Sequence, residues 1–235
     1  MRMSRIFRAA CALCLILAGP LRAESDAPVV IELFTSQGCS SCPPADALLG
    51  ELSKREDIIA LALHVDYWDY IGWKDKFASP AFTNRQKAYA RAAGSRTIYT
   101  PQMIVGGADH LMGYRPMDLA DLIQAHRAAA RPVTLRLRRD GGGLIVQAAS
   151  ERALDKEVVL QLVSYIPEKT VAITRGENAG RTGRYSNIVT SLTPVARWDG
   201  RTPLAMRFEM ADDTPVVAIL QETGAGPIIA AARLR

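Results

Sequence analysis

Short apolar runs alternate with helix-prone stretches in the first half of the chain. Residues 29–34 and 58–65 are apolar over strand length, and helical periodicity follows them at 43–52 and 83–93. Further along, the pattern predicts strands at 102–105 and 110–112 around a glycine turn, and a helix over 117–130 behind Pro116. This half therefore reads as strand, helix, strand, helix, strand, strand, helix (βαβαββα).

The second half changes to short stretches in which apolar and polar positions alternate. The stretches fall at residues 133–138, 144–148, 158–165, 186–192, 204–210, 216–221 and 227–231. About seven short strands over such a length are typical of a β-sandwich. We therefore expect an α/β thioredoxin-like domain at 24–130, whose sheet requires the βαβαββα order, followed by a mainly antiparallel, β-sandwich-like region at 131–235.

The amino terminus has the layout of a secretory signal. Arginines precede an apolar core at residues 9–18, and small residues up to Ala23 offer a cleavage site. That core is too short for the ~20 residues that span a bilayer. We expect residues 1–23 to be removed and the mature chain to be exported, periplasmic or secreted, without a membrane span.

Charge gives little support for a nucleic-acid partner. The chain has 29 Lys and Arg against 24 Asp and Glu, and four of the arginines (Arg2, Arg5, Arg8 and Arg22) lie in the leader. Removing the leader leaves 25 basic against 24 acidic residues, a net charge near zero. Nucleic-acid or anionic-membrane binding is therefore not indicated.

Two cysteines remain in the mature chain, because Cys11 and Cys14 belong to the leader. The remaining pair forms the run Cys39-Ser40-Ser41-Cys42 between the first strand and the first helix. A helix amino terminus stabilises a thiolate, so Cys39 is the expected nucleophile and Cys42 the resolving thiol. The hydroxyls of Ser40 and Ser41 could add hydrogen bonds, and no cofactor beyond this redox-active pair is expected.

Two other interpretations of the cysteine pair stay open. A static disulfide is one, although so small a loop gives weak stabilisation. A copper or zinc site is the other, with the thiolates joined by His64 or His110. No further mature cysteine can complete a four-thiolate site, and the histidines do not cluster in sequence.

Thr100, Pro101 and Glu32 are candidate partners of the thiols. Thr100-Pro101 stands directly before a predicted strand and resembles the threonine and cis-proline that face the C-x-x-C of thioredoxin-like proteins. Glu32 is an acid within an apolar strand, and a buried carboxyl could exchange a proton with Cys42. The alternatives are a trans proline that opens an edge strand, and a glutamate that faces solvent or a lysine.

An aromatic segment follows the second strand, at the sheet edge where sites collect. Asp66, Trp68 and Trp73, with Tyr99, could line a groove for an extended peptide, or the aromatics could belong to the core. The polar stretch 175–184 reads as a hairpin tip or as a lid near the thiols.

The residues at 32–46, 64–73 and 99–102 resemble domain-of-unknown-function family 1223, a family of secreted bacterial thioredoxin-like proteins. The resemblance implies a fold and an exported location, without an established reaction. We expect a thiol–disulfide oxidoreductase that acts on protein or peptide thiols and disulfides together with a redox partner. A non-catalytic binding module is the alternative, and metal binding is the third choice.

Overall fold

The computed structural model describes residues 27–129, 132–210 and 214–234, so the expected signal segment 1–23 lies outside the described residues. The elements are β1 (Val29–Thr35), α1 (Pro43–Leu52), β2 (Ile58–His64), the 3-10 helix η1 (Asp69–Ile71), α2 (Pro80–Ala92), β3 (Gln102–Val105), β4 (Asp109–Met112), α3 (Pro116–Ala128), β5 (Val133–Asp140), β6 (Gly143–Ser150), β7 (Val158–Ala172), β8 (Thr182–Trp198), β9 (Leu204–Glu209), β10 (Val216–Glu222) and β11 (Ile228–Leu234). Each strand and helix that the sequence predicts has a counterpart among them.

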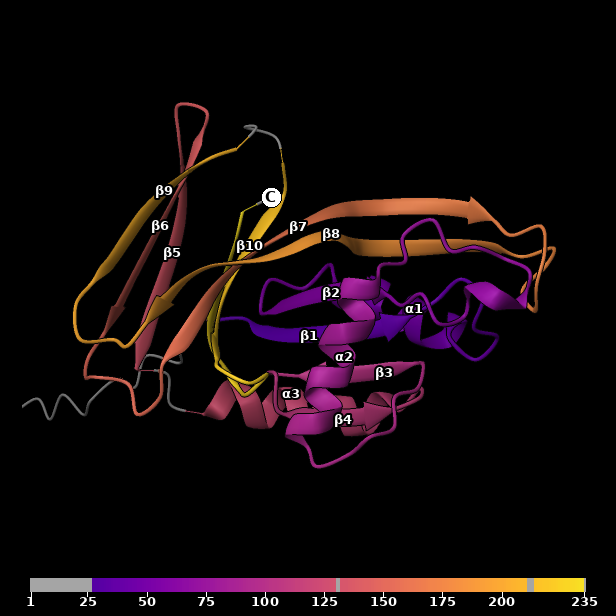
Figure 1. Cartoon of the computed structure of the whole chain (residues 1–235), viewed down its shortest axis with the longest axis horizontal. Helices are drawn as coiled ribbons and strands as arrows, with labels where there is room; N and C mark the ends of the chain where they lie inside the picture. Colours follow the sequence, from indigo (N-terminus) through magenta and orange to yellow (C-terminus); the bar gives the residue numbers. More distant parts are fainter. Residues whose placement is uncertain (1–26, 130–131, 211–213, 235) are drawn as a thin grey trace, which may run out of the picture.

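The fold is mixed α/β, with few helices and a large, mostly antiparallel sheet (Figure 1). The eight strands of this sheet lie in the order β11-β10-β7-β8-β2-β1-β3-β4, and only the β1–β2 and β2–β8 pairs are parallel. A separate three-stranded sheet has the order β5-β6-β9. No helix in the described part of the chain is long and apolar enough to cross a membrane.

Alternation along β1 divides the packing between two faces of the large sheet. Ile31 and Leu33 pack with residues of α1 and α3, whereas Val30 and Phe34 pack in the cluster that contains Tyr89 of α2. Successive side chains of a strand point to opposite faces, and here both faces are covered. This explains why β1 reads as one continuous apolar run, and it decides which helix each residue of β1 meets.

The strands of the second half do not form a self-contained sandwich. β7, β8, β10 and β11 extend the sheet of the first half, because β8 pairs with the free edge of β2 at Ala62 and Ile188. The β5-β6-β9 sheet packs on these added strands around residues such as Val146, Leu160 and Trp198. The sheet therefore crosses the expected boundary at residue 130, and the sandwich-like part shares one of its layers with the first half.

β7 and β8 are much longer than the sequence predicted. They span 15 and 17 residues, and Figure 1 shows them running the whole length of the sheet. Their connecting loop, residues 173–181, is thereby carried to the end of the sheet where α1 begins. This long hairpin is the element that brings the second half of the chain to the cysteines.

Candidate functional site

Cys39 and Cys42 form a disulfide at the start of α1, with their Cα atoms 5.4 Å apart. β1 leads into this turn, in which the amide of Cys39 donates to the carbonyl of Ser36 at 3.1 Å. Cys42 is the N-cap residue of α1, and its carbonyl accepts the amide of Asp46 at 3.0 Å. The prolines that follow fit the first turn of a helix, where no amide partner is required. The predicted position of the pair, between a strand and a helix, is confirmed.

Both cysteines are completely buried, with 0 % of their surface exposed. Ser40 and Ser41 between them are exposed, and the Ser41 hydroxyl lies 3.4 Å from the Cys39 sulfur. A nucleophile must reach a disulfide sulfur directly to exchange with it. In the closed arrangement seen here, the serines rather than the sulfurs meet the solvent.

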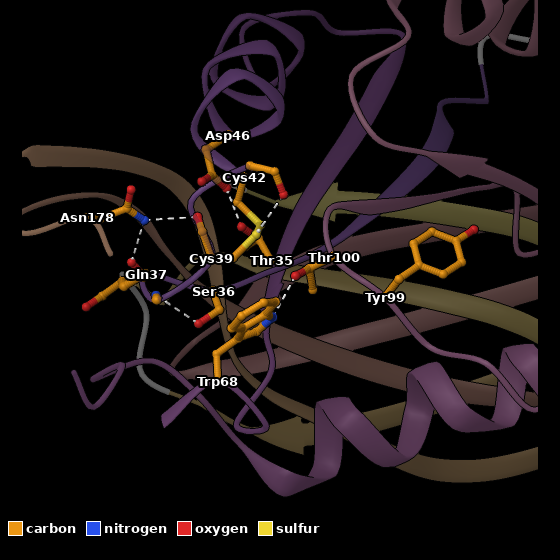
Figure 2. Close-up of a disulfide and its surroundings, with 12 residues drawn as sticks. Thr35, Ser36, Gln37, Cys39, Cys42, Asp46, Trp68, Tyr99, Thr100 and Asn178 are labelled. Atoms are coloured by element: carbon orange, nitrogen blue, oxygen red, sulfur yellow. Dashed lines mark hydrogen bonds between the residues drawn. A yellow bond between two sulfur atoms is a disulfide. The ribbon is translucent and has the colours of Figure 1, made fainter. Parts of the chain in front are cut away.

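The β7–β8 loop covers Cys39 through Asn178. The Asn178 side-chain amide donates to the carbonyls of Gln37 and Cys39, both at 2.9 Å (Figure 2). The indole of Trp73 donates to the Gln37 side chain at 2.8 Å, and Gly176 packs against Trp73. We call residues 173–181 the clasp, because they hold the cysteine turn from outside. Asn178 was not singled out as a site residue, although the polar stretch 175–184 in which it lies was considered as a lid near the thiols.

Trp68 and Thr100 flank the disulfide on another side. The indole of Trp68 donates to the Thr100 hydroxyl at 2.8 Å, and the Thr100–Pro101 bond is cis, as expected (Figure 2). The Tyr99 ring points away from the disulfide in Figure 2, while its carbonyl accepts the Gln86 amide. Trp68 and Thr100 therefore lie beside the disulfide, whereas the Tyr99 ring does not.

Asp66 binds α2 and makes no hydrogen bond near the disulfide in the described structure. Its carboxylate accepts the Thr83 hydroxyl at 2.5 Å, and its amide donates to the same hydroxyl at 3.3 Å. Thr83 lies in the first turn of α2. The predicted substrate-binding role of Asp66 therefore has no support from its contacts, which are those of an anchor for this helix.

Glu32 does not face Cys42, and the proposed proton exchange between them is wrong. Glu32 is fully buried on the α2 side of the sheet, where Arg85 donates to both carboxylate oxygens at 2.6 and 3.0 Å. The Tyr89 hydroxyl donates to the same carboxylate. α1 packs on the opposite face, with Ile31 and Leu33, because side chains alternate along a strand. Glu32 instead joins α2 to the sheet.

A different acid, Asp46, lies close to Cys42 and was missed. Asp46 is 7 % exposed, follows Cys42 by one helical turn, and accepts the Thr35 hydroxyl at 2.8 Å. Burial raises the pKa of Asp46 to about 7, while the charge of His64 works in the opposite direction. The spacing of four residues within a helix was the sequence signal that could have found it.

Behind the cysteine turn lies a buried His64–Asp75 pair. The His64 Nδ1 is 2.7 Å from an Asp75 oxygen, and the same oxygen accepts the Gln37 amide at 2.8 Å. Both side chains are fully buried. Asp75 thus fixes the loop that leads to Cys39, whereas His110 contacts Tyr89 and Gln102 elsewhere.

A metal centre finds no support in these contacts. In the described parts of the chain, no three His, Cys, Asp or Glu side chains gather as a metal would require. The two cysteines are bonded to each other, and the ring nitrogen Nδ1 of His64 is engaged by Asp75. These residues as arranged do not form a copper or zinc ligand set.

A cavity of about 440 Å³ lies next to Ser36 and Pro43 of the cysteine turn, between α1 and the long β7–β8 hairpin. Asp46, Asn178 and Tyr185 contribute to its lining, and charged residues such as Arg181 and Glu168 stand where it meets the surface. The Asn178 side-chain oxygen is buried without a hydrogen-bond partner in the described structure. The cavity therefore touches both the clasp and the acid of α1.

A family model described as "Protein of unknown function (DUF1223)" matches residues 30–221. The chain belongs to this family. It is also similar to the crystal structure of protein AGR_C_4864 from Agrobacterium tumefaciens, with 30 % sequence identity and a TM-score of 0.75 over 88 % of this chain and 93 % of that chain. No curated protein matches. The DUF1223 match includes the cysteine pair, Asp46 and the clasp.

Proposed function

We propose that this DUF1223 protein is an exported thiol–disulfide oxidoreductase that uses the Cys39–Cys42 pair on protein or peptide substrates. The observation that carries the proposal is the disulfide at the amino terminus of α1. Backbone N–H groups at a helix start favour a thiolate, which is the attacking and leaving species in disulfide exchange. The leader-like sequence at residues 1–23 supports an oxidising compartment, where such chemistry takes place.

The arrangement of the first half supports a thioredoxin-like assignment. The elements β1, α1, β2, α2, β3, β4 and α3 follow in that order, and four of the strands lie as β2-β1-β3-β4. β1 and β2 are parallel, whereas β3 and β4 run antiparallel to their neighbours. We infer that residues 29–128 form a thioredoxin-like unit, to which the long β7–β8 hairpin and its partners are added.

The proposed exchange begins when a substrate thiolate attacks the Cys39 sulfur. The Cys39–Cys42 bond breaks, its electron pair stays on the Cys42 sulfur, and a mixed disulfide joins the substrate to Cys39. A second substrate thiolate then attacks the substrate sulfur and releases the Cys39 thiolate. The substrate leaves oxidised and the protein leaves reduced. The reverse sequence reduces a substrate disulfide at the expense of the dithiol.

Access to Cys39 requires the clasp to move. Neither sulfur is exposed, and the Asn178 amide bridges two carbonyls of the cysteine turn. Because these are two ordinary hydrogen bonds at the end of a long hairpin, their net stabilisation is about 1–3 kcal/mol. A free energy of opening of this magnitude leaves the site closed most of the time and still lets it open often enough to react.

The proposal is tested with the two single-cysteine variants and the wild-type protein. Wild type should catalyse reduction of insulin by a dithiol or oxidative refolding of a reduced protein, and Cys39→Ser should abolish this activity. In the absence of added dithiol, reduced Cys42→Ser should accumulate a mixed disulfide with a disulfide-bonded substrate, because Cys42 is no longer there to resolve it. A wild-type protein without either activity, or a Cys39→Ser variant as active as wild type, contradicts the proposal.

A second candidate function is binding without catalysis, which the burial of both sulfurs and the neighbouring cavity favour. In that case the disulfide only fixes the turn above the cavity. A double Cys39→Ala, Cys42→Ala variant would then keep the biological activity of the protein in cells, whereas an oxidoreductase would lose it. The two functions therefore give opposite results in one complementation assay.

A further inference from the structure

Reduction of the disulfide leaves a charge in a buried place. When the Cys39–Cys42 bond breaks, the electron pair remains on the Cys42 sulfur, which has 0 % of its surface exposed. An unpaired charge away from water costs several kcal/mol, so the Cys42 thiolate must receive a proton. The reverse reaction must remove that proton before Cys42 can attack. A proton partner is therefore required on the buried side of the disulfide.

Asp46 stands where this partner is needed. The Asp46 amide donates to the Cys42 carbonyl at 3.0 Å within α1, and side chains four residues apart lie on the same helix face. Figure 2 shows the Asp46 carboxyl beside Cys42 and the Thr35 hydroxyl that binds it at 2.8 Å. Only one carboxyl oxygen is occupied by this hydroxyl in the described structure, which leaves the other for proton exchange.

We propose that Asp46 gives a proton to Cys42 when the disulfide opens and takes it back when the disulfide forms. This role of Asp46 rests on the proposed function, thiol–disulfide exchange at Cys39 and Cys42. In reduction, the Asp46 carboxylic acid transfers its proton to the leaving Cys42 sulfur and becomes a carboxylate. In oxidation, the carboxylate accepts the Cys42 proton, and the resulting thiolate attacks the Cys39 sulfur of a mixed disulfide and expels the substrate thiolate.

The charged surroundings of Asp46 suit this exchange. Its pKa is raised to about 7, mainly by burial and in part by Asp75, and is lowered by His64 and the Thr35 hydroxyl. Near neutral pH the carboxyl is therefore divided between its two forms, the condition under which one group both donates and accepts. His64 is itself engaged by Asp75 at 2.7 Å, and Tyr185 of β8 has a pKa raised by burial. Burial among these groups is what raises the pKa of Asp46 above that of an exposed aspartate.

The cavity provides the route between Asp46 and solvent. Asp46 belongs to its lining, and the exposed Glu168 and Arg181 stand where it meets the surface. A proton can therefore pass between Asp46 and water through this opening.

The test follows the resolving step in a protein that carries glutathione on Cys39. Attack by Cys42 releases glutathione, and we expect the wild-type rate to rise through an inflection near pH 7. Asp46→Asn keeps the size of the side chain and should remove that inflection and slow the release about 100-fold at neutral pH. Glu51→Gln, in the same helix and cavity lining, should behave as wild type. An unchanged profile in Asp46→Asn overturns the proposal.

A measurement on the wild-type protein covers the case in which Asp46→Asn does not fold. Carbon NMR titration of the Asp46 carboxyl should give different pKa values in the oxidised and dithiothreitol-reduced protein, because the thiol and carboxyl share a proton. Equal values in the two states contradict the proposal. Neither experiment uses a protein substrate, so inactivity on insulin with an intact Asp46 inflection refutes the proposed function alone.

Discussion

The buried acids Glu32 and Asp46 have different surroundings and therefore affect the stability of the fold differently. Glu32 meets the guanidinium of Arg85, so its charge is balanced where it lies. Asp46 has a hydroxyl from Thr35 and no cation at contact distance in the described structure, and burial raises its pKa from 3.8 to about 7. The first acid stabilises the fold as a carboxylate, and the second opposes folding when it ionises.

Asp46→Asn should change how stability depends on pH. Between pH 3.8 and about 7 the folded wild type keeps a proton that the unfolded chain releases, so its stability falls as pH rises through this window. Above pH 7 the raised pKa of Asp46 lowers the free energy of unfolding of the wild type by roughly 4 kcal/mol. In urea unfolding of the oxidised proteins, the free energy of unfolding of the variant should rise relative to that of wild type from pH 4 to 7.5. Parallel pH curves would contradict this expectation.

Glu32→Gln should destabilise the protein without touching the reactivity of the disulfide. It leaves the Arg85 guanidinium, whose side chain is 11 % exposed, without its counter-charge. Removing one partner of a buried pair costs about 3–5 kcal/mol, whereas Glu51→Gln breaks only an exposed pair and should cost less than about 1 kcal/mol. Urea unfolding measures both, and the rate of dithiothreitol reduction under native conditions should equal that of wild type. A faster or slower reduction of Glu32→Gln would show that Glu32 does influence the reactivity of the disulfide.

At the scale of elements, the β7–β8 hairpin controls the cysteine turn although it lies far away in sequence. Asn178 is separated from Cys39 by 139 residues, yet it binds the carbonyls on both sides of Gly38. A Cβ on Gly38 itself would approach Ile71 and Trp68 to 3.2 and 3.3 Å, so the turn is confined from within as well. The cysteine turn is therefore held by the clasp from outside and by Ile71 and Trp68 from within.

Asn178→Ala should expose the disulfide. Loss of two hydrogen bonds weakens the closed state by about 1–3 kcal/mol, and 1.4 kcal/mol corresponds to a factor of ten in the open population. We expect dithiothreitol to reduce the variant about tenfold faster than wild type, as followed by thiol labelling. Glu177→Ala, at the exposed neighbouring position, should leave the rate unchanged. Equal rates for wild type and Asn178→Ala would show that the clasp does not limit access.

The local elements could be predicted from sequence because they depend on neighbouring residues. β1 and β2 are continuous apolar runs, and the C-x-x-C stands between strand and helix as expected. The start of α2 was placed three residues late, although Ser79 caps the helix and Pro80 fits its first turn. Alternation puts Glu32 and Thr35 on opposite faces, but both faces are apolar, so the pattern did not say which face α1 covers.

The non-local features could not be predicted in the same way. The positions after Ile166 are polar, so the pattern did not predict that β7 continues beyond it. The sequence of β8 does not indicate that this strand pairs with β2. Asn187 adopts a left-handed conformation within β8 and donates to the Ala60 carbonyl of β2. Such contacts join segments more than a hundred residues apart, which local periodicity does not describe.

At the scale of the whole molecule, the two halves are joined through a shared sheet and a buried polar cluster. Arg85 of α2 donates to the side chains of Gln161 in β7 and Gln221 in β10, at 3.1 and 3.0 Å. Gln221 also donates to the Tyr89 hydroxyl at 2.8 Å. If one half unfolded alone, this cluster would lose its partners while still buried, and the edge of β2 would open.

The whole chain should therefore unfold in one cooperative transition. Its three tryptophans lie in different parts of the chain: Trp68 binds Thr100, Trp73 binds Gln37 of the cysteine turn, and Trp198 lies in the core beneath the β5-β6-β9 sheet. A Trp198→Phe variant and a Trp68→Phe, Trp73→Phe variant separate the two fluorescence signals. Each signal should coincide with the far-UV circular dichroism transition of the same variant in urea. Fluorescence that changes at a lower urea concentration than the dichroism, in either variant, would mean that the halves fold separately and that β8 only docks on β2.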